Sequence, residues 1–142
     1  MVMKKIKSKP KSKRKLSPSK PQKEGYHLPI RTEEEQLEGL SEDLLDAWHR
    51  FRAFLVSLGE QDIHTSHRSI MFARKTCYTF VRPKKSALEV NFFLPQALDS
   101  ELLKKVTAVS KKKFVHVLQL IHSDQVERPL TKWIEEAYRH SG

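Results

Sequence analysis

The stretch that decides the fold runs from residue 69 to residue 94 and reads SIMFARKTCYTFVRPKKSALEVNFFL. Residues 69–73 and 76–82 are short runs rich in β-branched and aromatic side chains, and Pro83 suits the second position of the turn that follows. Residues 88–94 then alternate between an apolar face and a mixed face, which is typical of a strand on the core. The stretch therefore predicts short strands joined by tight turns.

Helical periodicity flanks these strands on both sides. Residues 41–58 predict a helix with Ser41 as its N-cap and Gly59 at its end, and their apolar side chains recur at helical spacing. Residues 126–140 show the same spacing, so we expect a closing helix with Pro129 in its first turn.

One further strand is expected between these regions. Residues 99–106 fit a short helix or a structured loop, and residues 114–121 are apolar on both faces, which places that strand inside the sheet. The order is helix, strands, short helix, strand, helix. We therefore predict an α+β domain in which a small antiparallel or mixed sheet is covered by an N-terminal and a C-terminal helix.

Positive charge is concentrated at the start of the chain. The 142 residues carry a formal net charge of +10, and residues 1–24 hold ten bases against one acid, whereas the rest is nearly balanced. This Lys-, Ser- and Pro-rich segment cannot bury enough apolar surface to offset an ordering entropy of ~1–2 kcal/mol per residue. We predict a disordered basic arm over 1–24, an acidic connector over 25–39 and an α+β domain over 40–142. Within the connector, Thr32 and Glu35 have the spacing of a capping box that opens one helical turn.

The arm suits a polyanionic partner. Bases that neutralise phosphates release counterions, which favours binding of nucleic acid with little regard to sequence. A solvated charge run that only aids solubility is the alternative. The candidate nucleic-acid-binding residues of the arm are Lys4, Lys5, Lys7, Lys9, Lys11, Lys13, Arg14, Lys15 and Lys20.

Several catalytic patterns are missing from the sequence. No acid-x-Lys triplet of the restriction-nuclease type occurs, and the four glycines are too scattered to form a phosphate-binding loop. His64 and His67 would point to opposite faces of an extended segment, so we predict neither a metal site nor a cofactor. The sequence favours a non-enzymatic protein.

One histidine is nevertheless a candidate for chemistry. His116 lies between Phe114 and Leu118 on the inward face of the last predicted strand, where an imidazole needs a hydrogen-bond partner and can have a displaced pKa. We favour a core histidine with satisfied hydrogen bonds. The alternative is a ligand cleft formed by His64, Glu89 and His116.

A second group of bases flanks the predicted strands. These residues would form a secondary basic patch, although bases also commonly line the edge of a sheet without binding anything. They are Arg74, Lys75, Arg82, Lys84 and Lys85.

Several short motifs occur in a characteristic order between residues 48 and 138. They are Trp48-x-x-Phe51, IMFARK at 70–75, RPKK at 82–85, VHVLQL at 115–120 and WIEEAY at 133–138. In these motifs the chain resembles a bacterial family known as domain of unknown function 5655. The resemblance implies a small α+β module, often appended to nuclease or restriction-type proteins, and some members carry the label "predicted transport protein". It assigns no catalytic residues.

Together these features predict a non-enzymatic, nucleic-acid-associated accessory module that binds through its basic arm. Two alternatives stay open: a small-ligand-binding or hydrolase-like domain with a cleft near His116, and a protein-partner-binding module with a solubilising arm. No apolar run reaches the ~20 residues that span a bilayer, so we expect no membrane insertion. The single cysteine, Cys77, fits a reducing compartment, and we expect a cytoplasmic protein, or a nuclear one if the source has a nucleus.

Overall fold

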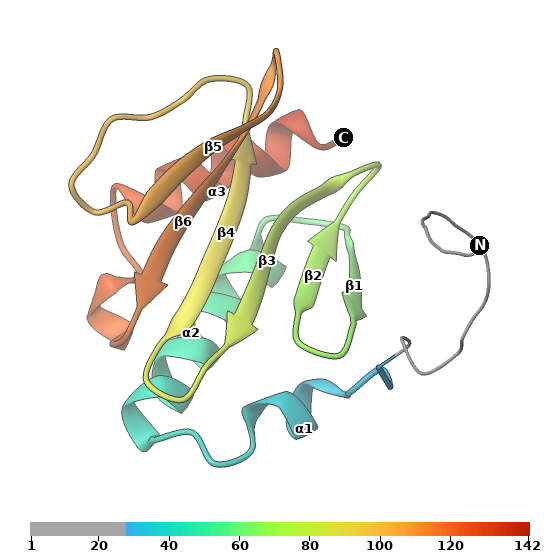
Figure 1. Ribbon diagram of the computed structural model, residues 1–142, viewed down its shortest axis with the longest axis vertical. Coiled ribbons are helices and arrows are strands. Elements are labelled where there is room, and N and C mark those ends of the chain that lie inside the picture. Colours follow the sequence, from blue (N-terminus) through green and yellow to red (C-terminus); the bar gives the residue numbers. More distant parts are fainter. Residues whose placement is uncertain (1–27) are drawn as a thin grey trace, which may run out of the picture.

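The computed structural model describes residues 28–142, so the basic arm predicted over 1–24 lies outside the described residues. The described part forms one sheet with its two long helices packed on one side (Figure 1). In chain order the elements are α1 (Glu33–Leu37), α2 (Glu42–Ser57), β1 (Asp62–Thr65), β2 (Ile70–Ala73), β3 (Cys77–Pro83), β4 (Leu88–Leu94), β5 (Lys105–Ser110), β6 (Lys113–Leu120), the 3-10 helix η2 (Ser123–Gln125) and α3 (Leu130–His140).

The six strands form one antiparallel sheet in the order β1-β2-β3-β4-β6-β5. In Figure 1 both long helices, α2 and α3, lie behind the sheet, and the face turned to the viewer carries no helix. The predicted α+β class, with an N-terminal and a C-terminal helix covering the sheet, is confirmed, and the sheet is antiparallel rather than mixed.

The core lies between the sheet and these two helices. Trp48 of α2 packs against Phe72 of β2 with ring centroids 6.2 Å apart, and Trp133 of α3 stacks on Phe92 of β4 at 6.0 Å. Helix α2 begins where Ser41 Oγ accepts a hydrogen bond from the Leu44 N–H, as its N-cap position requires. The fully buried apolar side chains of α2 and the sheet include Phe51, Leu55, Ile70, Val81, Leu88, Val90 and Leu120.

The predicted elements are mostly present, with corrections at the sheet edges. The edge strands β1 and β5 were not predicted, and the segment expected as a short helix or loop over 99–106 is a loop that runs into β5. Helix α3 begins at Leu130 rather than near residue 126, because η2 occupies Ser123–Gln125 and Pro129 takes the N-cap position, without a side-chain capping hydrogen bond. The hairpin after β3 reverses over residues 84–87, where the Lys84 N–H donates to the Ala87 carbonyl oxygen at 2.9 Å.

The acidic connector is attached to the domain from residue 28 onward. Thr32 and Glu35 form the predicted capping box of α1. Glu33 makes a bidentate ion pair with Arg52 of α2, at 2.8 Å and 2.9 Å, and the Arg31 N–H donates to the Ser66 carbonyl oxygen at 3.2 Å. These contacts place α1 against the end of the sheet that holds the β1–β2 loop.

Candidate functional site

One face of the sheet has no helix over it among residues 28–142. Side chains alternate along a strand, so Phe92 and His116, which point toward the helices, have neighbours Phe93 and Val115 that point the other way. We call this second side of the sheet the open face.

Two phenylalanines lie side by side on the open face. Phe80 of β3 and Phe93 of β4 are half-buried, and their ring centroids are 6.0 Å apart. A cation lies over each ring: the Arg82 guanidinium carbon is 5.4 Å from the Phe80 centroid, and the Lys113 ammonium is 4.7 Å from the Phe93 centroid. Exposed cation–π interactions contribute only ~0.5–1 kcal/mol, so they orient these bases without locking them.

A shallow hollow of about 580 Å³ lies on the same face. Of its nine lining residues, four are bases and one is an acid, so its electrostatic potential is positive. We call it the basic hollow. It is lined by Arg82, Lys84, Glu89, Asn91, Lys104, Lys105, Thr107, Val115 and Val117.

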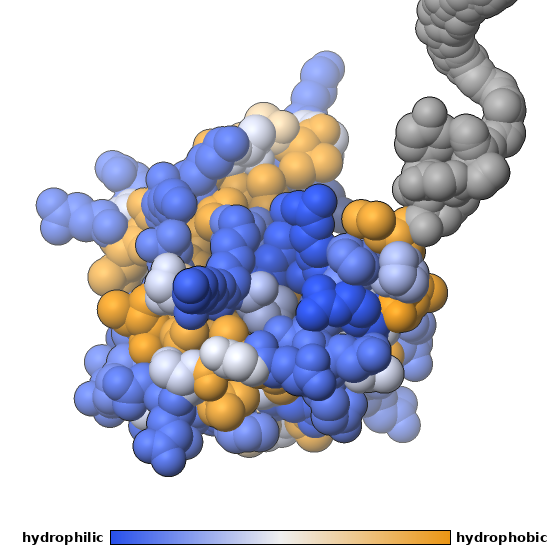
Figure 2. All heavy atoms as spheres, turned by 60° about the horizontal axis from the view of Figure 1, so that its bottom comes forward, coloured by the Kyte–Doolittle hydropathy of each residue, from blue (hydrophilic) through white to orange (hydrophobic). Residues whose placement is uncertain are grey.

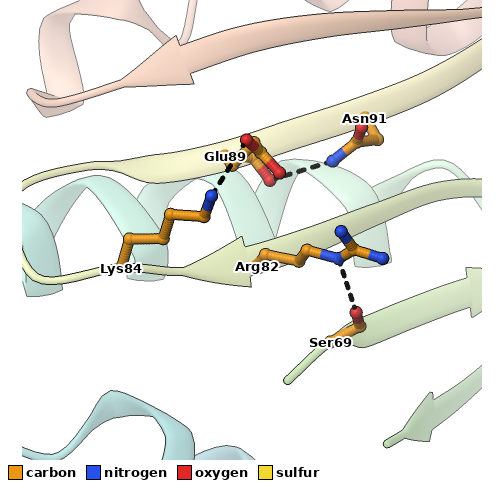
Figure 3. A network of polar contacts seen from close by, with 5 residues as sticks. All are labelled: Ser69, Arg82, Lys84, Glu89 and Asn91. Atoms are coloured by element: carbon orange, nitrogen blue, oxygen red, sulfur yellow. Dashed lines mark hydrogen bonds and ion pairs between the residues drawn. The ribbon is translucent and has the colours of Figure 1, made fainter.

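The polar contacts at the edge of the hollow differ in what they do to its charge (Figure 3). Lys84 Nζ donates to Glu89 Oε2 at 3.3 Å, so this pair is neutral as a unit. Arg82 Nε donates to the hydroxyl oxygen of Ser69 at 3.2 Å, an uncharged partner. Asn91 Nδ2 donates to the Glu89 carbonyl oxygen at 3.4 Å. Arg82 therefore keeps its full positive charge at the rim.

A second cavity, of about 250 Å³, adjoins the hollow and shares Arg82 and Lys84 with it. We call it the arginine cavity. Figure 2 turns the end of the domain that lies lowest in Figure 1 toward the viewer, and strongly hydrophilic side chains gather near the centre of that end. The cavity is lined by Arg31, Gln36, His67, Arg68, Arg82, Pro83 and Lys84.

The structure divides the predicted secondary basic patch into two groups. Arg82, Lys84 and Lys85 lie at the β3–β4 hairpin, whereas Arg74 and Lys75 lie in the β2–β3 turn at the other end of β3, roughly 20 Å away at ~3.3 Å per residue. Residues at opposite ends of one strand cannot form one patch.

Arg74 and Lys75 are engaged with the end of the chain. The Arg74 guanidinium lies 4.2 Å from the Tyr138 ring centroid, and its Nη1 donates to the Tyr138 carbonyl oxygen at 2.9 Å. The Lys75 N–H donates to the Ser141 carbonyl oxygen at 2.9 Å. These contacts fix α3 to the sheet, so we assign Arg74 a packing role.

The three residues of the predicted ligand cleft are not brought together. His116 points into the core, whereas Glu89 lies on the open face of the neighbouring strand β4. His64 lies on the edge strand β1, three strands from β4, which is about 14 Å at the ~4.8 Å spacing of neighbouring strands. These three side chains share no cleft, because two sit far apart and the third is on the other side of the sheet.

His116 is a buried residue with its own hydrogen-bond partners. Its ring stacks on Phe92 with centroids 5.0 Å apart, and its Nε2 accepts a hydrogen bond from the Leu98 N–H at 3.1 Å. Burial lowers the pKa of His116 below its ordinary value, and the nearby carbonyl oxygens of Phe92 and Phe114 oppose this shift. The imidazole is neutral at neutral pH and ties the loop after β4 to the core.

The phenylalanine pair and two lysines of the hollow were missed as site residues. Phe93 does break the polar pattern of its face of β4, and this apolar residue on a non-core face was the available signal. Lys104 and Lys105 gave no such signal, because their position depends on β5, a largely exposed strand at the edge of the sheet.

Other kinds of site have little support in residues 28–142. They contain no group of three or more side chains placed to hold a metal ion, and no helix there is long and apolar enough to cross a membrane. Burial raises the pKa of the Cys77 thiol, which disfavours the reactive thiolate. The candidate residues of the basic arm, Lys4 to Lys20, lie outside this region.

The fold and its open face define a small α+β domain in which one side of the sheet carries no helix among residues 28–142. The sequence model of the family described as domain of unknown function, DUF5655, matches residues 33–141, and the chain belongs to this family. The match includes α1, which precedes the motifs quoted above. Neither a curated protein nor a solved structure shows significant similarity to the chain.

Proposed function

We propose that this domain is a binding module for single-stranded nucleic acid, which lies on the open face. The observation that carries the proposal is the placement of the Phe80–Phe93 pair beside the basic hollow, on a sheet face without a helix in residues 28–142. The basic arm adds affinity that depends little on sequence.

The charge of the hollow suits a phosphate backbone. Glu89 neutralises Lys84, which leaves Arg82, Lys104 and Lys105 unpaired with any carboxylate of residues 28–142. Each lysine or arginine side chain that neutralises a phosphate releases counterions. For single strands, the logarithm of the binding constant then falls with the logarithm of the salt concentration at a slope of about 0.7 per neutralised phosphate. Three such bases give a modest, salt-sensitive affinity.

The aromatic pair supplies a second, less salt-sensitive contribution. Stacking of a base on an aromatic side chain contributes ~1–3 kcal/mol and tolerates any base. The ammonium group over Phe93 belongs to the flexible side chain of Lys113, so it can move onto a phosphate when a nucleobase covers the ring. The bases of a duplex are already stacked, and this favours a single strand as the ligand.

The arm extends this electrostatic attraction. Residues 1–24 hold ten bases and one acid, and they precede a domain that is nearly neutral overall. We therefore assign most of the salt dependence of binding to the arm, and the preference for single strands to the open face.

A binding titration tests the proposal. The labelled oligonucleotide is about ten nucleotides long, which is within the ~4–16 nucleotides that small single-strand-binding domains cover. The Phe93→Ala substitution is expected to weaken binding about 5- to 150-fold. This corresponds to ~1–3 kcal/mol for a nucleobase that no longer stacks on the ring. Removing residues 1–24 is expected to lower the salt slope by about 0.7 for each phosphate that the arm neutralises.

The matched control is Phe54→Ala, which removes a half-buried phenyl ring from α2 on the helix side of the sheet. This variant should bind as the wild type does. Absence of binding by the full chain would sink the proposal, as would equal binding by wild type and Phe93→Ala. Binding that depends only on residues 1–24 would leave a basic tether and no role for the open face.

A further inference from the structure

The arginine cavity is built from cations held by uncharged groups. Arg31 donates through Nη1 to the His67 carbonyl oxygen at 3.3 Å and through Nη2 to the Glu35 carbonyl oxygen at 3.1 Å. Arg82 is held by the Ser69 hydroxyl. These hydrogen bonds fix the guanidinium groups but do not neutralise them, so their charge remains available to a ligand.

Gln36 holds the loop that forms one wall of the cavity. Its Nε2 donates to the carbonyl oxygens of Arg31 at 3.1 Å, Ser66 at 2.9 Å and Ser69 at 3.2 Å. The side chain is buried, and these three acceptors fix which end of the amide carries the nitrogen. Its Oε1 is buried and has no hydrogen-bond partner among residues 28–142.

The β1–β2 loop brings two more side chains to the cavity. His67 Nδ1 lies 2.8 Å from the Pro29 carbonyl oxygen, and because a carbonyl only accepts, Nδ1 carries the proton. Arg68 is exposed and forms no salt bridge within the described part of the chain. The lining thus holds three arginines that form no salt bridge among residues 28–142, together with Lys84, which pairs with Glu89 outside the cavity.

We propose that the arginine cavity binds the terminal phosphate monoester of a nucleic-acid strand that lies on the open face. This inference rests on the proposed function. A monoester carries about −1.5 to −2 charges at pH 7, more than the single charge of a backbone diester, and so matches a site with several cations. Guanidinium groups also bind phosphate oxygens in a bidentate manner.

The position of the cavity supports a strand end rather than a separate small ligand. Arg82 and Lys84 line both the basic hollow and the arginine cavity, so a strand that follows the hollow toward the β3–β4 hairpin reaches the cavity.

The test compares single-stranded oligonucleotides of one sequence with a 5′-phosphate, with a 3′-phosphate, or with hydroxyls at both ends. A fourth oligonucleotide, one nucleotide longer with hydroxyl ends, adds backbone charge without a monoester. The full chain is expected to bind one phosphorylated form about tenfold more tightly than both hydroxyl forms, the low end of what charge-assisted hydrogen bonds contribute. Whichever end is preferred gives the polarity of the strand.

Arg68→Gln is expected to remove this preference, whereas Arg50→Gln, which removes the same charge from an exposed position on α2, should keep it. The melting temperature of each variant shows that the fold is intact. Equal binding of all four oligonucleotides by the wild type would overturn the inference and leave the proposed function standing. Binding of none of them would overturn both.

Discussion

The two faces of the sheet differ most clearly at two consecutive residues of β4. Phe92 is fully buried between His116 and Trp133, whereas Phe93 is half-buried beside Phe80 with a lysine over its ring. A phenylalanine is thus buried in the core on one face of the sheet, and a phenylalanine remains partly accessible on the other face. Residue type alone therefore does not show whether a side chain belongs to the core or to the candidate site. The face of the sheet toward which the side chain points decides this.

Around these two rings the surroundings differ as well. The helix side is apolar and encloses a neutral histidine, while the open face combines aromatic rings with uncompensated bases. Changes on the helix side should therefore affect stability first, and changes on the open face should affect binding first.

The largest effect is expected from Phe92→Ala. Removing a fully buried phenyl ring leaves a cavity and should lower the free energy of unfolding by about 3–5 kcal/mol. Phe93→Ala on the same strand should lower it by less than about half of that, because its ring is already partly in water. Urea unfolding of both variants measures the difference, and equal decreases would show that the open face is covered in solution.

Lowering the pH should reveal the contribution of the buried His116 to the free energy of unfolding. Because the folded-state pKa of His116 lies below its unfolded value near 6.5, the unfolded chain takes up the proton first, and stability present above pH 6.5 is lost as the pH falls. One such group gives a slope of at most about 1.4 kcal/mol per pH unit. His116→Gln should flatten the dependence of the unfolding free energy on pH below about pH 6.5. His49→Gln, at an exposed position, is the matched control.

Charge removal in the basic hollow should change binding with little change in stability. Lys104→Gln with Lys105→Gln is expected to lower the salt slope for single-stranded nucleic acid by up to about 1.4, two phosphates at about 0.7 each. The matched control is Lys111→Gln with Lys112→Gln in the β5–β6 turn, outside the hollow. The same decrease in both pairs would mean that only total charge matters.

The smallest effect is expected at the link between α1 and α2. The Arg52–Glu33 pair is bidentate but partly exposed, so Arg52→Gln should lower stability by only about 0.5–1 kcal/mol. If α1 supports the arginine cavity through Gln36, this variant should also weaken the preference for a terminal phosphate. Hydrogen exchange of residues 33–37 would show whether the helix has loosened.

The interior was predictable because its elements carry local signals. Helix α2 has a cap and an apolar stripe, the capping box of α1 is visible at Thr32 and Glu35, and β4 alternates. Strands β1 and β5 were missed because they are short, largely exposed edge strands whose stability comes from hydrogen bonds to a neighbour. Nothing in their own residues requires a strand.

The candidate site was less predictable because it depends on which strands are neighbours. The basic hollow needs Lys105 of β5 beside Val117 of β6, and this pairing is a property of the whole sheet. The grouping of His64, Glu89 and His116 failed for the same reason, since face and strand order together separate them. The prediction of a basic cluster did include Arg82, but Arg31 and Arg68 come from loops that only the fold brings to it.

The hydrogen bond from His67 to the Pro29 carbonyl oxygen fixes where the polypeptide enters the domain. Pro29, near the start of the described residues, therefore lies beside His67 at the rim of the arginine cavity. Under the proposed function, a polyanion bound by the lysines of residues 1–24 would be delivered to this end of the sheet rather than to an arbitrary part of the surface, which would raise its local concentration there. Moving the same lysines to the C-terminus would keep the net charge and remove this advantage of position.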